Sequence, residues 1–141
     1  EDVETAIAQA IFEKKPVGIG MDGSVTYDLR DSGHQIHTMK WEWATEVSIF
    51  VRATIVTDSS YSDATLKAIK ENIVQKLSTY AFGQDVTATS LYAPIYAEGV
   101  TDVTSLEISE DGTTFGTTAI TIDQNEIARI AVANIEVTVS E

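Results

Sequence analysis

The sequence predicts an α+β fold, with a mostly antiparallel sheet and two or three helices packed on one face. Some segments place apolar residues at helical spacing, others place them at every second position, and turn-forming residues separate the two kinds. With 141 residues, 43% of them hydrophobic, the chain can bury its own core rather than stay disordered. We therefore expect one domain over residues 1–141, with a candidate subdivision near residues 44–46.

Two segments have the periodicity of amphipathic helices. In residues 2–14, one predicted face holds Val3, Ala6, Ile7, Ala10 and Ile11. Pro16 and the glycines after it end this helix and open a loop. In residues 61–80, the predicted buried stripe is Leu66, Ile69, Ile73, Leu77 and Tyr80. Serines and aspartates before this stripe offer N-caps, and Gly83 is expected to end the helix.

A third, shorter helix is predicted where Leu91, Tyr92, Ile95 and Tyr96 share one side. Thr89 or Ser90 is the expected cap. Pro94 has no N–H and clashes with the preceding turn inside a helix, so this helix is either short or kinked. Gly99 should end it and lead into a strand over residues 100–108.

Period-two alternation predicts the strands. A first strand over 24–29 turns at Gly33 into a second, whose one face holds His37, Met39, Trp41 and Trp43. A central strand follows, with an apolar face of Val47, Ile49, Val51, Ala53 and Ile55. Later strands are expected over 119–122 and 135–139. Between them, Asp123 and Glu126 resemble a capping box, and a short turn, "EIARIA", is expected to follow.

The charge and composition exclude several functions. Nine Lys plus Arg against 22 Asp plus Glu give a net charge of −13, which opposes binding to nucleic acid or to an anionic membrane surface. The longest apolar runs are too short for a membrane-spanning helix. The chain has no cysteine, so disulfides and thiol chemistry are absent. The acidic surface instead favours solubility or a basic protein partner.

No residue pattern in the chain matches a catalytic, cofactor or metal motif. His34 and His37 stand three apart across a turn, which directs them to opposite faces of a strand. The acidic residues Asp102, Glu107, Glu110 and Asp111 lack the ligand order of a calcium loop. "GIGMDG" leads into a strand rather than a helix, unlike a phosphate loop. We expect no enzyme activity, no cofactor and no metal.

The aromatic residues are the remaining candidates for a site. Trp41 and Trp43 share a strand face with Met39 and pack in the core or in a subunit contact; we favour the core. Tyr92 and Tyr96 share the face of Leu91 and Ile95, where a tyrosine can pack its ring while its hydroxyl stays in contact with water. We assign Trp41, Trp43, Tyr92 and Tyr96 as candidate subunit contacts.

Four stretches resemble one known family. They are "AIAQAIFEKKPVGIG", "TEVSIFVRATIVTDSSYS", "LYAPIYAEGVTDVTSLEIS" and "NIEVTVSE". In this order they resemble the C-terminal part of the baseplate J-like family, the Mu-type wedge proteins of contractile phage tails. Each stretch alone is a pattern of apolar residues and glycine with low specificity, so the resemblance rests on the order and spacing of the four stretches.

The resemblance implies a structural role in a phage, prophage or tailocin baseplate. The partners it implies are other wedge and tail proteins, with self-association as a further candidate, in a virion assembled in the bacterial cytoplasm. Family members are usually longer, so we expect this chain to be a C-terminal fragment; the family has no catalytic residues to transfer. The alternative is a glycan- or peptide-binding module that uses exposed aromatics. An acid–base enzyme built on carboxylates ranks third.

Overall fold

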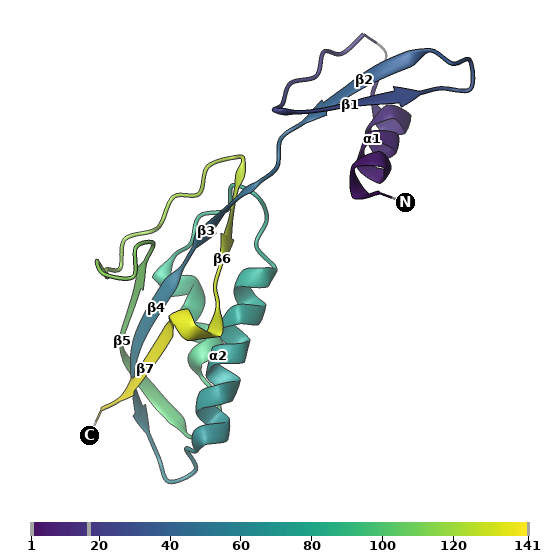
Figure 1. The fold of residues 1–141 in the computed structure, drawn as a ribbon. Helices are drawn as coiled ribbons and strands as arrows, with labels where there is room; N and C mark the ends of the chain where they lie inside the picture. The colour runs from purple at the N-terminus through teal and green to yellow at the C-terminus, as the bar shows by residue number, and fades with distance from the viewer. Residues whose placement is uncertain (1, 17, 141) are drawn as a thin grey trace. The chain divides into compact units, whose positions relative to one another are not determined.

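The structure, a computed structural model, describes residues 2–16 and 18–140. That part of the chain contains three α-helices and seven strands, and the strands form antiparallel and mixed sheets. This arrangement confirms the predicted α+β class. The chain divides into two compact units, Glu1–Trp43 (unit 1) and Ala44–Glu141 (unit 2), whose folds can be followed in Figure 1. This division lies beside the subdivision considered near residues 44–46.

Unit 1 is a β-hairpin with one helix, α1 (Val3–Lys14), packed against it. Strands β1 (Val25–Arg30) and β2 (Ile36–Trp41) pair antiparallel along their whole length. Asp31 shapes the turn between them, because its carboxylate accepts hydrogen bonds from the backbone N–H groups of Gly33 (2.8 Å) and Gln35 (2.9 Å). The predicted hairpin is therefore confirmed, including its turn at Gly33.

Helix α1 lies where the sequence predicts it, but the predicted face is covered only in part, with Ile7 and Ile11 half-buried. Val3, the first residue of the expected stripe, is 64% exposed, and Ala6 and Ala10 are exposed as well. The buried residue is Ala8, and Thr5 Oγ1 lies 2.7 Å from the hydroxyl of Tyr27 on the hairpin. Because this helix has alanine and apolar residues on more than one side, spacing alone did not select the contact face.

Unit 2 is built on a long central strand that is interrupted at Ile49. Its two parts are β3 (Thr45–Ser48) and β4 (Phe50–Thr57). On one side, β3 pairs parallel with β6 (Glu126–Arg129) and β4 pairs parallel with β7 (Ile135–Val139). On the other side, β5 (Val100–Ser109) pairs antiparallel with β4. The Ile49 N–H donates to the carbonyl of Arg129 (2.8 Å), so the pairing continues across the interruption.

Helical segments cover one face of this sheet. They are α2 (Asp63–Ser78), the 3₁₀ turn η1 (Ala88–Leu91), and the single turn α3 (Tyr92–Ile95). Ser62 caps α2 as predicted, in a reciprocal pair with Thr65. The helix ends at Ser78, before Gly83, which instead takes a positive φ of 66° in the loop that follows.

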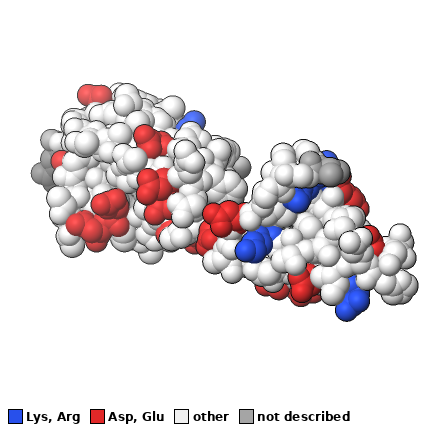
Figure 2. Space-filling view, turned by 90° about the horizontal axis from the view of Figure 1, so that it is seen from above, with Lys and Arg blue, Asp and Glu red and all other residues white. Residues whose placement is uncertain are grey.

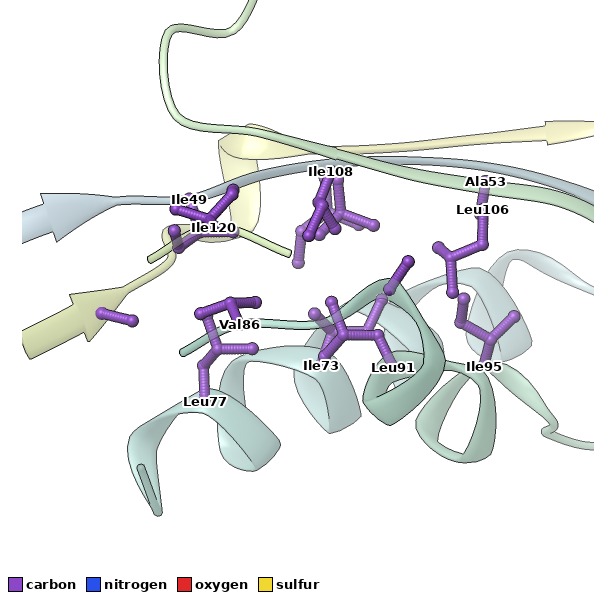
Figure 3. Close-up of a cluster of buried hydrophobic side chains, with 14 of the residues drawn as sticks. Ile49, Ala53, Ile73, Leu77, Val86, Leu91, Ile95, Leu106, Ile108 and Ile120 are labelled. Carbon is purple, nitrogen blue, oxygen red and sulfur yellow. The ribbon is translucent and has the colours of Figure 1, made fainter. Parts of the chain in front are cut away.

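The core of unit 2 lies between the sheet and this helical layer. In Figure 3, the side chains of Ile49, Ala53, Leu106 and Ile108 face those of Ile73, Leu77, Leu91 and Ile95. All eight are at most 3% exposed. The predicted alternation of the central strand is confirmed, and so is the α2 stripe except for Leu66, which is half-buried. Each fully buried Ile or Leu side chain contributes roughly 1.5–3 kcal/mol.

Two predicted elements near the C-terminus are wrong. Residues 119–122 form no strand beyond an isolated bridge between Ile120 and Val86. "EIARIA" is not a turn: Glu126–Arg129 is strand β6, and the 3₁₀ turn η2 (Val132–Asn134) follows it. Glu126 does accept a hydrogen bond from the Asp123 N–H (3.0 Å), as in a capping box. Pairing with β3 buries Ile127 and Ala128, which outweighs the local helix signal.

Candidate subunit-contact site

The two tryptophans lie at the end of the hairpin in unit 1. Trp41 ends β2 opposite Val25 and is half-buried, and its ring centroid lies 6.5 Å from that of Tyr27. Trp43 stands edge-on to Trp41, at 6.3 Å and 86°, and is 50% exposed. Trp41 Nε1 is buried and has no hydrogen-bond acceptor among the described residues. The favoured core reading thus fits Met39, which is 3% exposed, and not Trp43.

The loop before β1 is fixed to the strand that carries these rings. Glu42 accepts hydrogen bonds from the Ser24 hydroxyl (2.7 Å) and the Ser24 N–H (2.8 Å), and these bonds hold the pKa of its carboxyl below the ordinary value. Gly23 crosses close to Trp41, where an added Cβ would meet the Trp41 carbonyl oxygen at 2.2 Å. Only glycine allows that approach, so the backbone at Trp41 is held in place.

The two tyrosines of unit 2 have different surroundings. Tyr92 is half-buried against the core, whereas Tyr96 is 51% exposed. The cap of this helical segment is Thr87, whose hydroxyl accepts from the Ser90 N–H, rather than the expected Thr89 or Ser90. Pro94 fits without a kink because α3 has only four residues, and a proline near a helix start loses no intrahelical hydrogen bond.

The structure therefore assigns the four candidate contact residues to different units, the tryptophans to unit 1 and the tyrosines to unit 2. Trp43 and Tyr96 are the members of each pair that expose a large ring. Sequence reasoning missed other exposed apolar side chains, which are Val3, Ile19, Ile36, Phe82, Val132 and Val139. The alternation of residues 135–139 predicts a strand, but it does not reveal that β7 is an edge strand.

The histidines form no joint site. His34 is exposed with a positive φ of 63°, while His37 packs its ring 4.8 Å from that of Phe12. His37 Nε2 lies 3.0 Å from Asp31 Oδ2, and this hydrogen bond, before those from Gln35 and Gly33, lowers the pKa of the Asp31 carboxyl. The pair stabilises the hairpin turn. Within residues 2–16 and 18–140, no three His, Asp or Glu side chains converge to hold a metal.

The acidic loop after β5 is organised by one of its own aspartates. Asp111 Oδ1 accepts from the N–H groups of Thr114 and Thr113 (both 2.7 Å) and from the Ser109 hydroxyl (2.7 Å). These bonds place the pKa of Asp111 well below its ordinary value. The loop borders an open hollow of about 710 Å³ whose lining includes Glu110, Phe115 and Ile120. Because the bonds that organise Asp111 come from its own loop, they stabilise the turn and mark no ligand.

No helix in the described part of the chain has the length and apolar character needed to cross a bilayer. No protein-family model and no curated protein matches this chain.

Proposed function

We propose that this chain is a structural component of a contractile phage or prophage tail baseplate. It would be the C-terminal part of a wedge subunit and would act through protein–protein contacts. The observation that carries the proposal is the ordered resemblance of four stretches to the baseplate J-like family. Three of these stretches supply β4, β5 and β7, which are neighbours in the sheet of unit 2.

The second and third stretches also meet at a tight backbone contact, which supports reading them together. Gly99 has a φ of 85°, and a Cβ there would lie 2.4 Å from the Tyr61 nitrogen. The Asp58 N–H donates to the Gly99 carbonyl (2.9 Å). The glycine in "YAEGV" and the turn in "TDSSYS" are therefore parts of one packing arrangement, and their joint presence is more specific than either pattern alone.

Assembly would use exposed apolar rings within an acidic surface. Trp43 and Tyr96 each expose about half of their area, and tyrosine and tryptophan are enriched at the centres of interfaces. Asp and Glu side chains (red) outnumber Lys and Arg (blue) on the face drawn in Figure 2. Such a surface repels other copies of itself and attracts basic partners, so charge would select the partner while the rings supply binding energy.

The test is co-expression of the full-length protein with its neighbouring tail genes, followed by purification of wedge or baseplate complexes. We expect the protein in these complexes, and we expect Trp43→Ala with Tyr96→Ala to lower its incorporation roughly tenfold or more. Ser59→Ala, at an exposed polar position of unit 2, is the matched control and should incorporate normally. A full-length protein that never enters such a complex would contradict the proposal.

A glycan- or peptide-binding module remains the second candidate, because the Trp41–Trp43 pair leaves one ring half in solvent. Since both tryptophans of the chain belong to this pair, their fluorescence reports on it alone. Saturable quenching or enhancement by an oligosaccharide or peptide panel, lost in Trp43→Ala, would favour this function over assembly.

A further inference from the structure

The two edges of the β5-β4-β7 sheet differ in how they are protected against pairing with another strand. In β5, Thr101 and Thr104 are extra residues that shift the register, and their hydroxyls donate to the carbonyls of Val56 (3.1 Å) and Thr54 (3.2 Å). The end of β5 is also bridged, because Ile108 exchanges two hydrogen bonds with Gly116. Bulges and covering segments are the usual ways to block an edge.

The β7 edge has none of these devices among the described residues. Its pairing with β4 is regular from Ile135 to Val139, and the segment "IEVTV" contains no proline and no lysine. The Ser140 N–H donates to the Ile55 carbonyl (2.8 Å), so it points toward β4. Because successive residues of a strand turn their backbone groups to opposite sides, Val137 and Val139 direct N–H and C=O away from the sheet. Ile135 does so too, but its N–H is already bonded to Val132.

Side chains flank the β7 edge on both faces of the sheet. On the helix-covered side, Val137 packs against the core, Val139 is 41% exposed, and η2 leads directly into β7 (Figure 1). Beside η2, an open groove of about 350 Å³ runs along α2, and it is lined by Asp63, Leu66, Lys67, Lys70, Glu71 and Val132. On the other face, Glu136 bonds to Arg52 (3.0 Å) and its side chain stays 63% exposed.

We propose that β7 is a docking edge that accepts an extended strand from a basic partner protein. The added strand pairs with the outward N–H and C=O groups of Val137 and Val139. Its apolar side chains face the groove beside η2, and Lys or Arg on its other side lies next to Glu136. This interaction surface stands apart from the baseplate proposal, because it follows from the sheet edge alone.

Charge and size favour this occupant over a second copy of the chain. Residues 44–141 contain fourteen Asp plus Glu and five Lys plus Arg, a net charge of −9, so a second copy meets like charge. Pairing of two β7 edges would also involve only five residues from each copy, against about 20–30 per side in a stable interface. A short basic strand needs no such area, since main-chain hydrogen bonds and one groove suffice for peptide recognition.

The test is titration of the full chain with an alternating valine–lysine heptapeptide, followed through backbone amide NMR signals. We expect the Val137 and Val139 amides to shift and their hydrogen exchange to slow. An alternating valine–glutamate heptapeptide should bind roughly tenfold more weakly, because it faces Glu136 with like charge.

Substitutions at the edge complete the test. Val137→Pro removes one outward donor and should abolish binding; Val139→Pro does the same at a more exposed position, so it serves if the first variant fails to fold. Val139→Thr keeps the N–H and should bind normally. The proposal is overturned if neither proline variant weakens binding, if both peptides bind alike, or if the peptide moves no β7 amide. It is equally overturned if the same amides shift with protein concentration alone, which would assign the edge to a second copy.

Discussion

Unit 2 has a core and unit 1 scarcely has one. Among the described residues, twenty hydrophobic side chains of unit 2 are buried, whereas in unit 1 only Ala8 and Met39 are. Chains of about 40 residues rarely bury enough apolar surface to fold alone without disulfides, metals or partners, and this chain has no cysteine. Unit 1 nevertheless exposes half or more of Val3, Ile19, Ile36 and Trp43. The difference indicates that unit 2 supplies most of the stability, while unit 1 leaves large apolar side chains exposed.

The largest expected effect comes from opening a cavity in the core of unit 2. Ile73 is fully buried at the centre of α2, so Ile73→Ala should lower the free energy of unfolding of unit 2 by about 2–5 kcal/mol. The matched change in unit 1, Ile36→Ala, removes a side chain that is 50% exposed and should cost less than about 1 kcal/mol. Urea denaturation of the two variants measures both values. Equal losses would contradict the comparison.

Backbone strain at Gly99 should have the next largest effect. Gly99→Ala adds a Cβ that meets the Tyr61 backbone at 2.4 Å and forces a side chain into a positive φ, so we expect a loss of at least about 1–3 kcal/mol. Gly20→Ala in unit 1 is the control, because no atom lies within 4 Å of an added Cβ there. Thermal unfolding of both variants should show a lowered midpoint for Gly99→Ala alone. A neutral Gly99→Ala would mean that this contact contributes nothing to unit 2.

The smallest expected effect is a pH dependence confined to the hairpin turn of unit 1. The pKa of Asp31 lies below its ordinary value of 3.8 because His37, Gln35 and Gly33 donate to the carboxylate. Its contribution to stability is thus fully present above pH 3.8 and is lost as pH falls through the lower, folded pKa. The amide NMR signals of Gly33 and Gln35 should move toward unfolded values on acidification below that point. In Asp31→Asn, which has no carboxyl to titrate, the same signals should stay constant; an identical acid response there would contradict this cause.

Much of the fold could be predicted from the sequence because the hydrophobic periodicity and the helix-capping residues agree with the way the elements pack. The alternation of Val51, Ala53 and Ile55, and the stripe of Ile69, Ile73 and Leu77, each match a buried face. "EIARIA" failed for the opposite reason: its local capping pattern is real, but long-range pairing with β3 decides its structure. Parallel pairing of β7 with β4 joins residues more than 80 positions apart, which no local pattern encodes.

Less of the candidate site could be predicted. The sequence identified Trp43 and Tyr96 as contact candidates, and both expose about half of their area, but it did not separate them from Trp41 and Tyr92, which are half-buried. The exposed fraction of each ring depends on which helix or strand ends beside it in the folded chain. The hydrophobic periodicity of the sequence does not determine this. The β7 edge was missed for a related reason, since an edge strand and a central strand have the same alternation.

The most direct test of the difference between the units is a single urea titration read by two probes. Both tryptophans lie in unit 1, so their fluorescence follows that unit, while the amide NMR signals of Ile73 and Ala53 follow the core of unit 2. We predict that the fluorescence transition occurs at a lower urea concentration than the loss of the unit 2 amide signals. Coincident transitions would show that the chain unfolds as one cooperative body, and would contradict the claim that unit 2 is more stable than unit 1.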